Sequence, residues 1–297
     1  MPTVKSKKNK LRLGVPGRAL REQFLELLRM AGYNVDVSDS GHKMTVDDPE
    51  IDCFLSKTQE LATWVENGML DAAVVQRARL LEQNIKAEEI AQFNFGNGIW
   101  DLTRVVLSVP RDSKIKSLKD LQGGEVVSRL PNLTKKFLKE KGISAKVIHV
   151  SYPGEAKAEM FNRPLVDFTN TGRTLAEHNL VILAQIMTTA PVLIMNKEAA
   201  KDKWKREKME NLAMLLQGAR LAKDMVGLIL HASNEIMGEV LRILPAMKKP
   251  TVTQLRGEDT FDILTVINKK QARELVPYLK KIGATDIVEF PLEKVII

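Results

Sequence analysis

The sequence predicts an α/β protein with two α/β lobes followed by a smaller third unit. Short β-branched and apolar runs alternate with segments that have apolar residues at helical spacing, along most of the 297 residues. The hydrophobic fraction of 44% and the charged fraction of 28% are those of a globular protein with a sizeable core. From Met225 onward the order becomes strand, helix, two strands, helix and strand, which is typical of a ferredoxin-like domain.

The first part of the chain is predicted to form a parallel sheet flanked by helices. A helix over Arg18–Ala31 has apolar residues on one face and stops at Gly32, and a second over Thr58–Asn67 is ended by Gly68. Strand, helix and strand in this order indicate parallel pairing. Strands are expected at Leu11–Pro16, Met44–Val46, Ile51–Leu55 and Asp71–Val75.

The middle of the chain repeats the alternation and predicts the second lobe. The run Leu180–Met195 is expected to form a helical segment, a bend at Pro191 and a strand, and Ala199–Ala222 a long helix with an apolar face. Before these, strands are expected at Leu102–Val109, Glu125–Ser128 and Ala145–Val150, and helices at Leu118–Leu121, Asn132–Lys141 and Tyr152–Phe161.

The third unit is predicted to bind an effector or another subunit, because such domains rarely carry chemistry. Gly283 is expected to end its second helix. Its strands are predicted at Val226–His231, Phe261–Ile267 and Thr285–Phe290, and its helices at Glu235–Leu244 and Gln271–Ile282.

The net charge of +8 and the isoelectric point of about 9.4 suit polyphosphate substrates. A nucleic-acid partner is not expected, because the basic residues are dispersed and aromatic residues make up only 5% of the chain. Cys53 is the single cysteine, so no intramolecular disulfide can form, and the scattered histidines have no zinc-site spacing. No metal ligand is assigned from these residues.

No membrane segment is expected either. Met1–Lys10 is rich in lysine and lacks the apolar stretch of a signal peptide. Polar residues and Pro191 interrupt the longest apolar run, Leu180–Met195. These features predict a cytoplasmic protein.

The most informative stretch is Leu165–Glu177, which is expected to form a strand end, a polar turn and a helix. Thr174 and Glu177 have capping-box spacing, so the helix is predicted to start there. Gly172 permits a sharp turn, and the free N–H groups of residues 170–175 would then form an anion site. Asp167, just before the turn, could accept two hydroxyl groups of a sugar. Together they suggest a phosphorylated pentose, and the alternative is a plain strand–turn–helix.

Four segments are similar to signatures of one enzyme family. The most specific is Asp-Phe-Thr-Asn-Thr-Gly-Arg-Thr-Leu at 167–175, and the others are Leu130–Thr134, Leu244–Val252 and Gly283-Ala284. Because they occur in the family's order and spacing, the chain from Leu11 to Ile297 resembles ATP phosphoribosyltransferase of the long form, the first enzyme of histidine biosynthesis.

The resemblance implies two α/β lobes of the periplasmic-binding-protein-like type around a cleft, and a C-terminal ferredoxin-like (ACT-like) regulatory domain. The first lobe would comprise residues 1–103 and 187–222, the second residues 104–186, and the regulatory domain residues 223–297. The family assembles as dimers and hexamers and is inhibited by histidine, so both properties are expected here.

The implied reaction joins N1 of ATP to C1 of 5-phosphoribosyl diphosphate and releases pyrophosphate, with Mg²⁺ on the diphosphate. The leaving group is already good and the reacting centre resembles an oxocarbenium ion. Such a pentosyl transfer depends on positioning and charge neutralisation more than on a dedicated acid or base. No catalytic acid, base or nucleophile is therefore assigned.

By the same resemblance, Asp167 would hold the ribose hydroxyl groups, and the following loop would hold the 5-phosphate. Arg18, Lys57, Arg77 and Glu155 are candidates for the ATP side. The loop residues implied in binding 5-phosphoribosyl diphosphate are Thr169, Asn170, Thr171, Gly172, Arg173 and Thr174.

The ATP side departs from the family pattern. Ala73–Ala78 stands where the family has a Gly-Ile-Thr-Gly-x-Asp turn, and Pro16 stands where it has a lysine. Arg163 replaces an acid four residues before Asp167. An alternative is thus a non-catalytic homologue that binds 5-phosphoribosyl diphosphate or a nucleotide. A nucleic-acid-binding protein is a third hypothesis, supported by the net charge alone.

Overall fold

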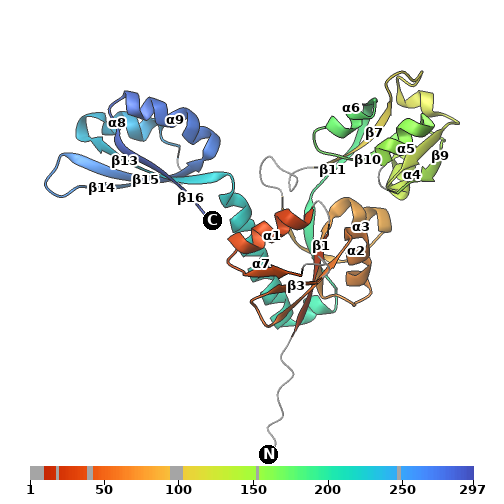
Figure 1. Ribbon diagram of the computed structural model, residues 1–297, viewed down its shortest axis with the longest axis horizontal. Coiled ribbons are helices and arrows are strands. Elements are labelled where there is room, and N and C mark those ends of the chain that lie inside the picture. Colours follow the sequence, from red (N-terminus) through yellow and green to blue (C-terminus); the bar gives the residue numbers. More distant parts are fainter. Residues whose placement is uncertain (1–9, 18–19, 39–42, 94–102, 152–153, 246–248) are drawn as a thin grey trace, which may run out of the picture. The chain divides into compact units, whose positions relative to one another are not determined.

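The computed structural model describes residues 10–17, 20–38, 43–93, 103–151, 154–245 and 249–297. Within these residues the strands form three sheets, of seven, five and four strands. Figure 1 shows the elements in the colours of the sequence. By its contacts the chain divides into two compact units, which are described separately. Residues up to Glu26 and Tyr33–Ala213 form the first unit with the two larger sheets, and Leu27–Gly32 and Met214–Ile297 form the second. The predicted α/β fold class is confirmed.

The seven-stranded sheet belongs to the first lobe and is mixed. β1 is parallel to β4 and β5, as expected, but β12 runs antiparallel to β5 and β6. The two outer strands β2 and β6 were not predicted, since β2 has only three residues and β6 is largely polar. The strand order is β2 (Val35–Val37), β3 (Lys43–Val46), β4 (Ile51–Ser56), β1 (Leu11–Pro16), β5 (Ala72–Gln76), β12 (Pro191–Met195) and β6 (Glu88–Gln92).

Helices α2 (Thr58–Glu66) and α3 (Arg77–Gln83) pack on one face of this sheet. Leu61 and Val65 of α2 lie in one buried cluster with Val75 and Ile194 of the sheet. A Cβ on Gly14 would approach side-chain atoms of Leu61, Leu70 and Ala73 at 2.8 Å. Glycine at position 14 therefore allows the close approach of α2 to β1. Helix α1 spans Arg21–Met30.

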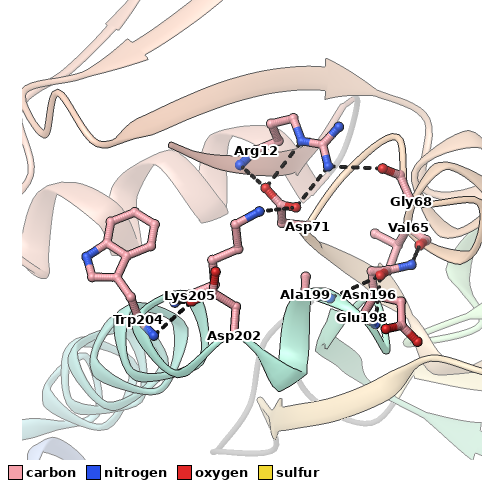
Figure 2. A network of polar contacts seen from close by, with 10 residues as sticks. All are labelled: Arg12, Val65, Gly68, Asp71, Asn196, Glu198, Ala199, Asp202, Trp204 and Lys205. Atoms are coloured by element: carbon pink, nitrogen blue, oxygen red, sulfur yellow. Dashed lines mark hydrogen bonds and ion pairs between the residues drawn. The ribbon is translucent and has the colours of Figure 1, made fainter. Parts of the chain in front are cut away.

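A buried carboxylate fastens the start of helix α7 (Lys203–Ala222) to the same sheet (Figure 2). Asp71 accepts hydrogen bonds from Nη2 of Arg12 and Nζ of Lys205, each at 2.9 Å. Burial by itself raises the pKa of Asp71, but hydrogen bonds from the Arg12 side chain, the Arg12 backbone and Lys205 outweigh it and lower the pKa below its ordinary value. Asp202 caps α7 by accepting from the Trp204 N–H at 3.0 Å, so the helix starts after a short 3₁₀ turn at Ala199–Lys201.

The five-stranded sheet forms the second lobe, and residues alternate between its two faces. Val105, Leu107 and Val109 pack under α4 (Pro131–Glu140), while Val106 faces α5 (Gly154–Phe161) and α6 (Arg173–Glu177). A short 3₁₀ helix spans Leu118–Leu121. The strand order is β11 (Leu180–Thr189), β7 (Thr103–Pro110), β10 (Leu165–Thr169), β8 (Glu125–Ser128) and β9 (Lys146–His149).

The predicted helical segment at the start of Leu180–Met195 is wrong. Leu180–Thr189 is a ten-residue strand, β11, paired antiparallel with β7. Its register shifts between Ile182 and Ala184 and again between Gln185 and Met187. These irregularities interrupt the period-two burial pattern of a strand, which is why the sequence looked helical.

The second unit has the strand order of a ferredoxin-like domain, as predicted. All pairings are antiparallel, and α8 (Asn234–Ile243) and α9 (Lys269–Lys281) cover one face of the sheet (Figure 1). Its first hairpin strand was missed in the sequence, because Thr251–Gln254 is exposed along its whole length. Within the described residues, no helix combines the length and apolar character that a membrane span requires. The order is β14 (Thr251–Gln254), β15 (Thr260–Asn268), β13 (Met225–Ser233) and β16 (Thr285–Pro291).

Candidate functional site

The candidate site lies at the carboxyl ends of the parallel strands β8 and β10. Because these strands are neighbours, residues that end or follow them meet at one edge of the sheet. Arg129 follows β8, and its Nη1 donates to Oδ1 of Asp167 at 2.9 Å. The Asp167 side chain is completely buried. The sugar-binding acid predicted from the sequence therefore has an arginine partner that the sequence did not indicate.

The two oxygens of Asp167 have different environments. Oδ1 accepts from Arg129 and from the N–H of Phe168 at 2.6 Å, whereas Oδ2 is buried and has no partner within the described residues. Burial raises the pKa of Asp167 to about 6, and nearby Glu155 adds to the rise against the opposing effect of Arg129. A Cβ on Gly154 would lie 2.5 Å from Oδ2, so a side chain at this position would collide with the oxygen. Oδ2 can thus accept a hydroxyl donor.

The loop after Asp167 is more tightly organised than the sequence suggested. Gly172 has a left-handed conformation with φ of 83° and is the N-cap of α6. Oγ1 of Thr169 accepts from the Gly172 N–H at 3.0 Å, and Oγ1 of Thr171 accepts from the Arg173 N–H at 3.3 Å. Two of the N–H groups expected to be free are therefore bonded within the loop.

The capping box predicted at Thr174 is wrong. Helix α6 starts one residue earlier, at Arg173, because Gly172 occupies the N-cap position. Glu177 accepts from the side-chain Nε of Arg173 at 2.8 Å, and not from a backbone N–H as a capping box requires. Asn170 contributes its backbone oxygen, which accepts from Nη2 of Arg104 at 3.2 Å. The turn is shaped by glycine and by two threonine hydroxyl groups.

A basic cavity of about 330 Å³ lies beside Arg129, between the two lobes of the first unit. Lys57 and Arg79 come from the first lobe, and Arg129 and His149 from the second. None of the residues that line the cavity is acidic, so its charge is positive. Such a cavity attracts anions. The complete lining is Lys57, Gln59, Arg79, Arg129, His149, Val150 and Ser151.

Side chains of helix α3 in the first lobe form hydrogen bonds with the backbone at the start of α4 in the second lobe. The Glu82 carboxylate accepts from the N–H groups of Asn132 and Leu133, each at 2.9 Å, and so caps α4 from the other lobe. Nη1 of Arg79 donates to the backbone oxygen of Arg129 at 3.0 Å. The cavity is therefore bounded by a fixed connection between the lobes.

Replacing Glu82 by Ala should destabilise the first unit by about 2 kcal/mol, because two N–H groups in the first turn of α4 lose the buried carboxylate that caps them. Denaturant unfolding of the full chain measures this loss. Glu177→Ala is the matched control, since Glu177 is exposed and pairs with Arg173 only on the surface. Equal losses for the two variants would contradict the cap.

The remaining predicted residues have different surroundings. Lys57 lines the cavity, and Glu155 is buried in the first turn of α5 beside Asp167. Arg77 begins α3, pairs with Glu89 at 3.1 Å and is not among the lining residues. Arg18 lies outside the described residues.

Sequence reasoning missed Arg79, Arg129 and His149. Arg129 directly follows a predicted strand beside that of Asp167, and this position was a usable signal. Nothing in the sequence singled out Arg79, because an arginine in a short helix is usually on the surface.

Comparisons with known proteins point to one family. The family model described as ATP phosphoribosyltransferase matches residues 57–218, and the model described as the HisG C-terminal domain matches residues 222–294. The ATP phosphoribosyltransferase of Thermodesulfovibrio yellowstonii is 38% identical over 286 residues, which cover 96% of this chain and 98% of the relative. That of Desulforudis audaxviator is 39% identical over 288 residues, covering 97% and 99%.

A solved structure supports the fold. The ATP phosphoribosyl transferase (HisG:HisZ) complex from Thermotoga maritima superposes with a TM-score of 0.57 at 24% sequence identity. The match covers 70% of this chain and 98% of that chain.

Proposed function

Since the chain belongs to the ATP phosphoribosyltransferase family, whose members are pentosyltransferases of histidine biosynthesis, we propose that it joins N1 of ATP to C1 of 5-phosphoribosyl diphosphate. The observation that carries this proposal is Asp167, a buried carboxylate that is linked through Arg129 to a basic cavity. The family match favours this enzyme over the non-catalytic alternative. Pyrophosphate is the second product.

Asp167 holds the ribose in this proposal. Its Oδ2 is buried and lacks a partner within the described residues, so it can accept a ribose hydroxyl group without displacing Arg129. Glu155 is close enough to raise the pKa of Asp167 and offers a second acceptor near the sugar. Gly172, Thr171, Arg173 and Thr174 receive the 5-phosphate at the turn before α6.

Positioning and charge neutralisation carry the reaction. The bond between C1 and the diphosphate breaks while the bond between N1 of ATP and C1 forms, and the diphosphate leaves with the electron pair. Cationic groups that face the leaving group stabilise its developing charge. Lys57 lies on this side and remains the candidate contact for ATP.

Mg²⁺ is expected to enter with the substrate. No group of three His, Cys, Asp or Glu side chains among the described residues could hold a metal ion by itself. Mg²⁺ commonly binds through substrate phosphates and one or two carboxylates, and no carboxylate of this chain is assigned to it. The ion would neutralise charge on the diphosphate.

The test is pyrophosphate release by the full chain with ATP, 5-phosphoribosyl diphosphate and Mg²⁺. We expect turnover that requires both substrates and is lost when the metal is chelated. Binding of 5-phosphoribosyl diphosphate without any pyrophosphate release would instead support the non-catalytic homologue.

Regulation and assembly are the finer parts of the proposal. The ferredoxin-like domain is expected to bind histidine and to inhibit turnover, and the chain is expected to form dimers and hexamers. The same assay with added histidine tests the first expectation, and light scattering with and without histidine tests the second. The cytoplasmic location stays a prediction.

A further inference from the structure

Arg79 is a buried arginine with few partners. Only 5% of the residue is exposed, although it lies in a seven-residue helix at the edge of the first lobe. Its one hydrogen bond within the described residues goes from Nη1 to the backbone oxygen of Arg129. A guanidinium group has five N–H donors, and Arg79 forms no ion pair with any described carboxylate. A buried cation in this state is costly unless a ligand completes its contacts.

Aromatic packing holds the Arg79 side chain in place. Its guanidinium lies 4.9 Å from the centre of the Phe168 ring, and that of Arg129 lies 5.9 Å from the same ring. Burial and the neighbouring Arg129 charge lower the pKa of Arg79 to about 10, so it is still charged at neutral pH. Two guanidinium groups thus pack on one ring, Asp167 pairs with Arg129 and not with Arg79, and none of the residues that line the cavity is acidic.

The rest of the cavity adds positive potential. Lys57 is the N-cap residue of the nine-residue helix α2, and its own side chain forms no capping hydrogen bond. Both Lys57 and Gln59 line the cavity, so this helix end borders it. Cations from both lobes therefore face the same space.

We propose that this cavity binds a diphosphate group, with the free N–H groups of Arg79 as its principal donors and Arg129 and Lys57 beside them. Arginine is suited to this role because its planar fork matches phosphate oxygens. Arg129 joins the cavity to Asp167, so a diphosphate here would be next to the ribose that Asp167 holds. The inference rests on the proposed function and assigns the leaving-group site to residues that the sequence did not single out.

Two substrates could supply this group. The diphosphate of 5-phosphoribosyl diphosphate fits because of the link to Asp167, and the phosphate chain of ATP has the same chemistry. Both sources require the same donors, so binding of free pyrophosphate tests the cavity and steady-state kinetics distinguish the sources.

The first experiment is calorimetric titration of the full chain with inorganic pyrophosphate and Mg²⁺. We expect Arg79→Met to weaken binding at least about tenfold, because a charged bidentate contact is lost. Arg79→Lys should retain part of the affinity. Arg163→Met is the matched control, because it removes one positive charge as well. Arg163 pairs with Glu125 on the surface, at the ends of β8 and β10 that lie opposite the candidate site.

A structural role alone predicts a different result. If Arg79 served only to join the lobes, Arg79→Met would lower the melting temperature and leave the affinity of the folded protein for pyrophosphate unchanged. That outcome would overturn the proposal. Should Arg79→Met not fold, wild-type affinity in Arg79→Lys would overturn it equally, since an ammonium group cannot replace the fork geometry.

Kinetics identify the source of the diphosphate. A raised KM for 5-phosphoribosyl diphosphate with an unchanged KM for ATP assigns the cavity to the sugar diphosphate, and the reverse assigns it to ATP. Unchanged values for both substrates would contradict the site. If the wild type bound pyrophosphate through Arg79 but showed no turnover, the proposed function would fail while the diphosphate site stood.

Discussion

Replacing Asp167 by Asn should lower kcat/KM for 5-phosphoribosyl diphosphate at least about a thousandfold, which corresponds to about 4 kcal/mol of transition-state stabilisation. The carboxylate is completely buried at the end of β10, and an asparagine side chain has nearly the same shape. The change therefore removes the negative charge that pairs with Arg129 and that we propose accepts the ribose hydroxyl group, while the packing stays. Steady-state pyrophosphate release measures the loss.

The same substitution should raise the stability of the protein at alkaline pH. The folded state raises the pKa of Asp167 to about 6, whereas an unfolded chain has a value of about 3.9. The free energy of unfolding is therefore highest below pH 4, where Asp167 is protonated in both states. It falls by about 3 kcal/mol in total as the pH rises to 6 and the buried carboxyl ionises. The amide side chain of the Asp167→Asn variant does not titrate, so the variant should be more stable than the wild type above pH 6 and should lose that advantage near pH 4.

Loss of activity with gain of stability separates a functional carboxylate from a structural one. If Asp167 only anchored Arg129, Asp167→Asn would destabilise the protein and leave the turnover of the folded fraction intact. Asp36→Asn provides the control, since Asp36 is exposed on β2 and should change neither quantity. Turnover within tenfold of the wild type would contradict the assignment of the sugar site.

The elements of the fold could be predicted where the local pattern was strong. Strands such as Leu11–Pro16 and helices such as α2 were found because apolar spacing and a terminal glycine mark them directly. The ten-residue strand β11 was missed because its bulges interrupt the alternation, and β14 because it is fully exposed. Both depend on pairing with distant strands, which a local window does not contain.

Only the part of the candidate site that is formed by Asp167 and the loop after it could be predicted from the sequence. Asp167 and Gly172 stand in a contiguous turn whose composition indicates a sugar phosphate. Arg79 and Arg129 are 50 residues apart and meet only because α3 of one lobe caps α4 of the other. The departure of Ala73–Ala78 from the family's glycine-containing turn was visible in the sequence. That an arginine directly after it would be buried in a cavity with Arg129 required the tertiary structure.

Replacing Asp71 by Ala should cost about 3 kcal/mol of stability. The carboxylate accepts from the backbone and side chain of Arg12 and from Lys205, and it is almost completely buried (Figure 2). Its loss removes an acceptor from the Arg12 N–H, the Arg12 guanidinium and the Lys205 ammonium, of which the guanidinium keeps only the Gly68 oxygen, and releases the start of α7 from β1 and β5. Denaturant unfolding of the full chain at pH 7 measures the effect.

Asp52→Ala is the matched control for Asp71→Ala. Asp52 stands opposite Arg12 on β4, but its ion pair with Lys10 is exposed and should contribute less than about 1 kcal/mol. The folded state lowers the pKa of Asp71 below its value of about 4 in the unfolded chain. The ionised carboxylate therefore stabilises the fold fully above pH 4, and this stabilisation is lost as the pH falls through the pKa of the folded state. The stability difference between wild type and Asp71→Ala should therefore shrink below pH 4. A difference that stayed constant down to pH 2 would mean that packing, and not the buried charge, holds α7 to the sheet.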